Sequence, residues 1–187
     1  VYRESRLHAL SQKEVGVRAA EKLGKKYEEC NFVVAHIGGG ISVAAHKKGR
    51  MIDGTDLLNG DCPIAPTRAG SMAPGQVAKL CFSGKYSEKE FKNLILKNGG
   101  IVDHLDTSDV LEVKSRIENG DKYAELVYNA MIYQVGKNIG TYSAVLNGEL
   151  DAVVLTGGIA QDKNLVSELK KMVGYLGEVI VFPGELE

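Results

Sequence analysis

The chain has 187 residues, of which 44% are hydrophobic and 25% are charged, so it is neither a disordered tail nor a membrane protein. Its 23 basic and 24 acidic residues give a net charge of −1, which offers no electrostatic basis for binding nucleic acid or an anionic membrane surface. No apolar run approaches the roughly 18 residues of a spanning helix, and no signal peptide opens the chain. Three cysteines without C-x-x-C spacing favour reduced thiols, and we expect a cytoplasmic protein.

The first part of the chain predicts one helix and then three short strands. Apolar residues at helical spacing predict a helix over 11–27, with Ser11 as its N-cap and Glu14 completing a capping box. Apolar runs separated by glycine turns then predict an antiparallel meander. Its strands are expected over 32–37, 42–47 and 50–53.

The remainder predicts helices followed by a strand–helix–strand unit. A long polar loop over 54–74 is of the kind that more often carries function than not. Periodicity and capping residues then predict helices over 74–82, 87–97, 108–119 and 121–146, a strand over 151–156, a helix over 162–173 and a last strand over 179–182. This order predicts a mixed α/β fold in one unit. Because the chain begins with Val1 and ends directly after a predicted strand, we expect it to be part of a longer protein.

Two turns rich in glycine are the first candidates for chemistry. The predicted strand ending at His36 runs into Gly38-Gly39-Gly40 and then Ser42, and the strand ending at Thr156 runs into Gly157-Gly158. Bare backbone N–H groups and a helix N-terminus are suited to phosphate. Each turn alone could equally be a plain structural turn, but two of them beside a polar loop with an arginine indicate a nucleotide cleft. Neither has the Walker sequence or G-x-G-x-x-G.

Arg68, in the polar loop, is the leading candidate for a functional cation, since a guanidinium contacts carboxylate or phosphate with two hydrogen bonds. The alternative is a loop arginine that caps carbonyl groups. The four histidines lack metal-ligand spacing, and His46 is expected at the surface or in packing. Glu185 could hold Mg²⁺ through water, or could be a solvated terminal carboxylate.

Together these segments resemble the acetate and butyrate kinase family, within the superfamily of sugar kinases, actin and heat-shock ATPases. The resemblance covers nearly the whole chain and is carried by residues 8–13, 36–42, 48–53, 68–71, 155–159 and 182–185. It implies a ribonuclease H-like lobe of the actin-like ATPase fold, with a mixed sheet flanked by helices. Residues 1–187 would be a single C-terminal kinase lobe, with the N-terminal lobe absent. Short-chain carboxylate would be phosphorylated by ATP with Mg²⁺.

Two details resemble the butyrate branch of this family. Acetate kinases typically read His-Leu-Gly-Asn-Gly where this chain has His36-Ile-Gly-Gly-Gly40. They also follow the loop arginine with Cys/Ser-Gly-Asp-x-Asp, whereas Arg68 is followed by Ala-Gly-Ser-Met-Ala. Butyrate and branched-chain acid kinases are similar to this chain at both places. Alternatives within the class are branched-chain, acetate and propionate kinases.

The resemblance also implies residue roles. Catalysis would fall to Arg68, His8 and His36, and Mg²⁺ to Glu185 or, if the register shifts, Glu187. The nucleotide would be held by Gly38, Gly39, Gly40, Ser42, Asp109, Gly157, Gly158, Ile159, Ala160, Gln161 and Asp162.

Two departures from the family pattern qualify these roles. Val110-Leu111 stand where the family often has an arginine near the base, so we expect adenine contact to be weaker or made differently. Without the N-terminal lobe and its second catalytic arginine, we expect at most trace kinase activity from this chain alone. We also expect a homo-oligomer, and the alternative from another class is a non-catalytic nucleotide-binding or dimerisation module.

Overall fold

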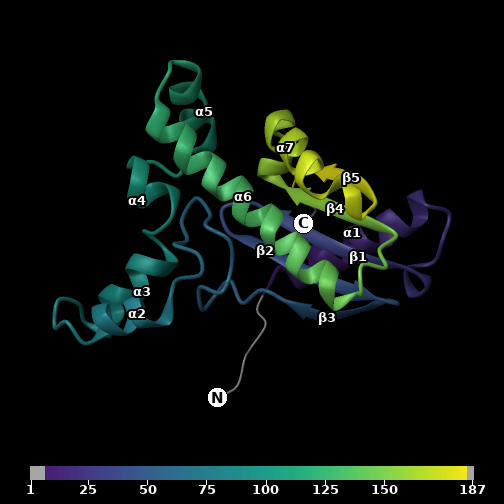
Figure 1. Cartoon of the computed structure of the whole chain (residues 1–187), viewed down its shortest axis with the longest axis horizontal. Coiled ribbons are helices and arrows are strands. Elements are labelled where there is room, and N and C mark those ends of the chain that lie inside the picture. Colours follow the sequence, from purple (N-terminus) through teal and green to yellow (C-terminus); the bar gives the residue numbers. More distant parts are fainter. Residues whose placement is uncertain (1–6, 185–187) are drawn as a thin grey trace.

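A five-stranded mixed sheet of order β3-β2-β1-β4-β5 forms the centre of the computed structural model, which describes residues 7–184 (Figure 1). Strands β1, β2 and β3 pair antiparallel, and β1–β4 and β4–β5 pair parallel. The predicted meander and the mixed α/β class are therefore confirmed. The strands are β1 (Asn31–Ile37), β2 (Ile41–Lys47), β3 (Arg50–Gly54), β4 (Ala152–Gly157) and β5 (Glu178–Pro183).

Helices cover both faces of the sheet, and a helical excursion extends away from it (Figure 1). The long helix α6 crosses one face and α1 lies on the other, while α2 to α5 lead outward from the loop after β3. None of the helices within residues 7–184 is both long and apolar enough to cross a membrane. The helices are α1 (Ala9–Lys22), α2 (Pro74–Cys81), α3 (Glu88–Leu96), α4 (Ile101–Leu105), α5 (Val110–Glu118), α6 (Lys122–Val145) and α7 (Lys163–Val173).

The alternation of side chains along β1 creates two different interiors. Val33, Ala35 and Ile37 face α6 and α7 and belong to the larger hydrophobic core. Phe32 and Val34 face α1 and belong to a smaller core. Because successive strand residues point to opposite faces, this second face also receives His36 near its end. The polar residues of β1 and β2 therefore gather under α1, away from the larger core.

The first helix differs from its predicted bounds at both ends. It begins at Ala9 with His8 as the N-cap, so the prediction that Ser11 caps it is wrong, and so is the capping box with Glu14. The Ser11 hydroxyl instead bonds the His36 ring. The helix ends at Lys22 because Gly24, with φ 68°, turns the chain, and the amide of Lys25 bonds back to the Ala20 carbonyl. Tyr27 lies in a separate three-residue turn.

Gly157 allows β1 and β4 to approach closely at the end of the sheet. Its φ of 95° and ψ of 166° fall in a region that only glycine occupies readily. A Cβ added there would lie 2.7 Å from the carbonyl carbon of Ile37. At Gly158, an added Cβ would meet no other heavy atom within 4 Å.

We therefore expect Gly157→Ala to lower the free energy of unfolding by about 2 kcal/mol or more, through backbone strain and the clash with β1. Gly158→Ala is the matched control and should change it by less than about 0.5 kcal/mol. Urea denaturation of both variants measures the difference. Equal losses in the two variants would contradict the assignment of the close approach to Gly157 alone.

Candidate functional site

The two glycine turns singled out in the sequence lie side by side. His36 of β1 is the register partner of Thr156 of β4, and both strands run in the same direction. Gly38–Gly40 and Gly157–Gly158 therefore leave the sheet at one edge. The buried Oγ1 of Thr156 has no hydrogen-bond partner among the described residues. Thr156 is fully buried, so the part of this edge open to a ligand is the turn backbone at Gly39, Gly40 and Gly158, whose N–H groups suit an anion.

The loop that carries Arg68 reaches the first of these turns. The hydroxyl of Thr67 donates to the Gly39 carbonyl at 3.2 Å. The other side of the loop is held by α4, because the amide of Ile101 donates to the Ala65 carbonyl at 3.1 Å. Gly100, with φ 78°, permits this contact, since an added Cβ would lie 2.9 Å from the carbonyl carbon of Arg68. The three segments that the sequence predicted to act together are thus neighbours.

The Arg68 side chain itself points to the end of α3. Its Nη1 donates to the Leu96 carbonyl and, at 3.0 Å, to the Thr67 hydroxyl. Its buried Nε has no hydrogen-bond partner within residues 7–184. In this structure Arg68 therefore makes the carbonyl contact of a capping loop arginine, and it keeps one unsatisfied donor.

His8 and His36 meet where α1 begins and β1 ends. Their rings are stacked, with centroids 3.8 Å apart. His8 Nδ1 lies 2.8 Å from the Ser42 hydroxyl, and His36 Nδ1 lies 3.2 Å from the Ser11 hydroxyl. Burial and the neighbouring His8 ring lower the pKa of His36 to about 4, so this imidazole is neutral near pH 7. The structure thus brings three of the predicted site residues into one cluster.

Two residues that sequence reasoning did not select connect to this cluster. Gln12 bonds Ser42 and His46, and Tyr27 bonds His46 from the other side. His46 is fully buried, which agrees with the packing role and not with the surface. A signal was present in the sequence, because His8, Gln12 and Gly16 recur at intervals of four and so share one face of α1.

A cavity of about 320 Å³ lies beside the second glycine turn. It unites the N-terminus of α5 with the turn that follows β4, two segments remote in sequence. Ala160 is buried in the larger core instead, and Gly157 faces β1. Asp109 caps α5 by accepting from the Leu111 amide at 2.8 Å. The cavity is lined by Asp109, Val110, Leu111, Lys114, Gly158, Ile159, Gln161 and Asp162.

Asp162 and Lys114 both line this cavity and form an ion pair in its wall. The Asp162 carboxylate accepts from Lys114 Nζ at 2.9 Å, from the Tyr128 hydroxyl at 2.7 Å and from the Asn164 amide at 3.0 Å. Burial opposes its ionisation, but the bonds from Tyr128 and Lys114 outweigh burial and lower the pKa of Asp162. Because three donors already bond to it, the Asp162 carboxylate holds α5, α6 and α7 together at this wall, and its main role here is structural.

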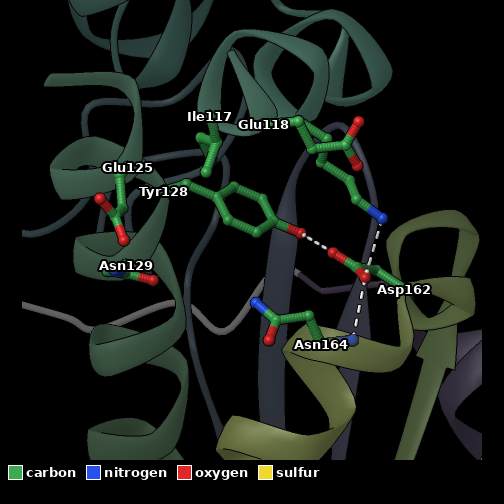
Figure 2. A pocket seen from close by; sticks show the side chains of 8 residues that line it. Ile117, Glu118, Glu125, Tyr128, Asn129, Asp162 and Asn164 are labelled. Atoms are coloured by element: carbon green, nitrogen blue, oxygen red, sulfur yellow. Dashed lines mark hydrogen bonds and ion pairs between the residues drawn. The ribbon is translucent and has the colours of Figure 1, made fainter. Parts of the chain in front are cut away.

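The same wall borders a second cavity, drawn in Figure 2. Its volume is about 210 Å³, and Glu118, Glu125 and Asn129 are among its lining residues. For metal binding, residues 7–184 contain no group of three or more His, Cys, Asp or Glu placed to hold an ion. Glu185, and the alternative Glu187, lie outside the described residues.

Comparison with known proteins gives consistent matches. A family model described as the Acetokinase family matches residues 2–179. The structure of Porphyromonas gingivalis acetate kinase is similar with TM-score 0.86 and 26% identity, covering 96% of this chain and 52% of that chain. A propionate kinase from Francisella tularensis gives TM-score 0.84 and 26% identity, with the same 96% and 52% coverage. The chain therefore spans about half the length of these matched structures.

A more distant likeness concerns the fold alone. A ROK family protein from Streptococcus pneumoniae matches with TM-score 0.54 and 14% identity, covering 92% of this chain and 59% of that chain. The arrangement of the sheet and its flanking helices is thus shared beyond the nearer relatives, which confirms the expected fold class.

The two buried histidines predict a specific pH dependence of stability. Burial lowers the folded-state pKa of His36 and of His46 to about 4, against 6.5 for an unperturbed imidazole. The unfolded chain therefore takes up protons first as the pH falls below 6.5, and stability is lost from there toward pH 4. We expect a loss of about 2 kcal/mol per histidine between pH 7 and pH 5. Urea denaturation across this range measures it, and a flat profile would mean that neither ring has a lowered pKa in the folded protein.

Proposed function

Because this chain belongs to the acetokinase family, we propose that it is the nucleotide-binding lobe of a carboxylate kinase that acts on butyrate. In the proposed reaction a carboxylate oxygen attacks the γ-phosphorus of ATP and the bond from that phosphorus to the β-bridging oxygen breaks. The products are acyl phosphate and ADP. The substrate is itself the nucleophile, so no covalent enzyme residue is required.

The observation that carries this proposal is the cavity beside the glycine turns. Val110, Leu111 and Ile159 give it apolar surface that suits a purine base. The Asp109 carboxylate suits ribose hydroxyl groups, which donate hydrogen bonds. The open backbone at Gly158 leaves room for phosphate to approach. A nucleotide lying there would extend toward Gly38–Gly40 along the edge shared by β1 and β4.

Charge stabilisation is the second part of the proposal. Phosphoryl transfer depends mainly on positioning and electrostatics, so cations and donors near the γ-phosphate supply most of the catalysis. We assign this to Arg68, whose loop contacts Gly39, and to the stacked His8 and His36. In this role the Arg68 guanidinium gives up its hydrogen bond to the Leu96 carbonyl and donates to oxygen atoms of the substrate instead.

Mg²⁺ is expected with the nucleotide, where it neutralises phosphate charge. Mg²⁺ sites in kinases usually use only one or two carboxylates together with substrate phosphates and water. The lack of a three-ligand group within residues 7–184 is compatible with such a site. We propose Glu185 as its carboxylate, with Glu187 as the other choice.

The identity of the acid rests on the resemblance at residues 36–40 and 68–72, which favours butyrate or a branched-chain acid. Acetate and propionate are the alternatives, since the two nearer structures bear the names acetate kinase and propionate kinase. Activity is proposed for the complete two-lobed protein, because those structures are about twice as long as this chain. A non-catalytic nucleotide-binding or dimerisation module is the second candidate, since the glycine turns and the cavity beside Gly158 would serve nucleotide binding without Arg68 or His8.

The first test is trapping of acyl phosphate as hydroxamate, with ATP, Mg²⁺ and acids from acetate to isobutyrate. The product of the longest reading frame that contains these residues is the enzyme, and the present chain is the control. We expect a butyrate-preferring signal from the long product and at most a trace from the chain. If the folded long product forms no acyl phosphate with any of these acids, the kinase proposal is overturned and the non-catalytic module remains.

The second test separates catalysis from binding. Arg68→Ala in the long product should lower kcat at least about a hundredfold while nucleotide affinity stays within about threefold, because the base and ribose contacts lie elsewhere. Arg50→Ala, at an exposed position on β3, is the matched control and should keep both values. Normal turnover in the Arg68 variant would refute its catalytic assignment.

A further inference from the structure

We propose that Gln12, His46 and Tyr27 are positioning residues that fix the tautomer of His8, through a buried hydrogen-bond chain of Tyr27, His46, Gln12, Ser42 and His8. In the tautomer set by this chain, His8 accepts at Nδ1 and carries its proton on Nε2. This inference rests on the proposed function, in which His8 donates a hydrogen bond to the transferring phosphoryl group. It adds how that donor is held in position. The tautomer itself can be measured without any kinase activity.

The orientation of the Gln12 amide is the starting point. Its Nε2 lies 3.3 Å from the Ser42 carbonyl oxygen and 2.9 Å from the Ser42 hydroxyl. A backbone carbonyl can only accept, so the amide nitrogen must face it and the amide oxygen must face the other way. That oxygen lies 3.1 Å from His46 Nε2. The backbone of β2 therefore decides which end of Gln12 each neighbour meets.

The protons of His46 and Tyr27 follow from this orientation. The Gln12 oxygen can only accept, so His46 carries hydrogen on Nε2. Burial lowers the pKa of His46 to about 4, which leaves the ring neutral with a lone pair on Nδ1. The Tyr27 hydroxyl, 2.7 Å from Nδ1, donates to it. Burial raises the pKa of Tyr27 to about 12, so this phenol keeps its proton.

The other branch leads to His8. The Ser42 hydroxyl oxygen accepts a hydrogen bond from the Gln12 amide, and its own hydrogen needs an acceptor. Among the described residues, His8 Nδ1 at 2.8 Å is the ring nitrogen within reach. Donation from Ser42 makes Nδ1 the acceptor and leaves the His8 proton on Nε2. The His8 ring is thereby oriented to donate from Nε2.

Burial and close packing make this chain rigid. Gln12, Ser42 and His46 are 0% exposed, so water cannot replace a member. Gly16 provides the space, since a Cβ there would lie 2.9 Å from Tyr27 Cε2 and 3.4 Å from His46 Nδ1. A buried polar network of this kind is stable only when every member is satisfied, which holds each ring in one state.

The test is the ¹⁵N NMR of the histidine side chains in the ¹⁵N-labelled long product near neutral pH, where protonated and bare ring nitrogens have well-separated shifts. We expect protonated Nε2 and bare Nδ1 for both His8 and His46. Protonated Nδ1 in either ring of the native protein would overturn the inference, and no variant is needed for this result.

Variants then test the coupling. Gln12→Met keeps the volume and removes the three hydrogen bonds that Gln12 makes with Ser42 and His46. The Ser42 hydroxyl is then free to reorient, and a population of His8 with Nδ1 protonated should appear. Tyr27→Phe tests the far end and should shift the Nδ1 signal of His46. Tyr142→Phe, which removes a buried hydroxyl on the opposite face, is the control and should move neither. Unchanged ¹⁵N signals of His8 in a folded Gln12→Met protein would refute the coupling. If that variant does not fold, an unchanged Nδ1 signal of His46 in Tyr27→Phe would refute it.

Kinetics separate this inference from the proposed function. In an active long product, Gln12→Met should lower kcat about tenfold or more with the KM for ATP nearly unchanged, since only the donor geometry is lost. A KM rise with constant kcat would contradict positioning. If the long product is inactive and the tautomers are as expected, only the kinase proposal fails. If it is active and His8 carries its proton on Nδ1, only this inference fails.

Discussion

The parallel contact between the ends of β1 and β4 is the constraint on which the remaining structure depends. Gly157 lies against the Ile37 carbonyl in a backbone conformation that other residues resist. This contact places the two glycine turns at one edge and opens the sheet there toward the Arg68 loop and α5. A side chain at Gly157 would push β1 and β4 apart. The candidate nucleotide cavity would then lie farther from the glycine turn that precedes Ser42.

The two faces of β1 divide structural and chemical tasks. The face toward α6 is wholly apolar along Val33, Ala35 and Ile37, and it supplies most of the burial that stabilises the fold. The face toward α1 ends in His36 and adjoins Ser42 and His46 of β2. Burying so many polar groups is tolerable because each finds a partner across the α1 interface. The face that stabilises the fold and the face that carries the proposed catalytic histidine are therefore opposite sides of a single strand.

Local pattern was sufficient for the strands, α6 and the glycine turns, because periodicity and turn chemistry act over a few residues. It failed where a partner from a distant segment decides the outcome. Ser11 has the chemistry of an N-cap, yet its hydroxyl is taken by His36. The Arg68 side chain is oriented by its hydrogen bond to the Leu96 carbonyl, and the Gln12 amide is oriented by its hydrogen bond to the Ser42 carbonyl of β2. Both partners are remote in the sequence, so neither orientation could be predicted from the neighbouring residues.

The topology also sets an order of assembly. The meander of β1 to β3 joins close neighbours in sequence, so it can form early at little entropic cost. The central pair of the sheet joins Phe32 to Ala152, and closing that long loop has to wait until β4 is available. Until then one edge of β1 has unpaired backbone groups and is open to wrong partners, including another copy of the chain. The candidate nucleotide cavity, which requires β4 and α5 together, is consequently among the last features to appear.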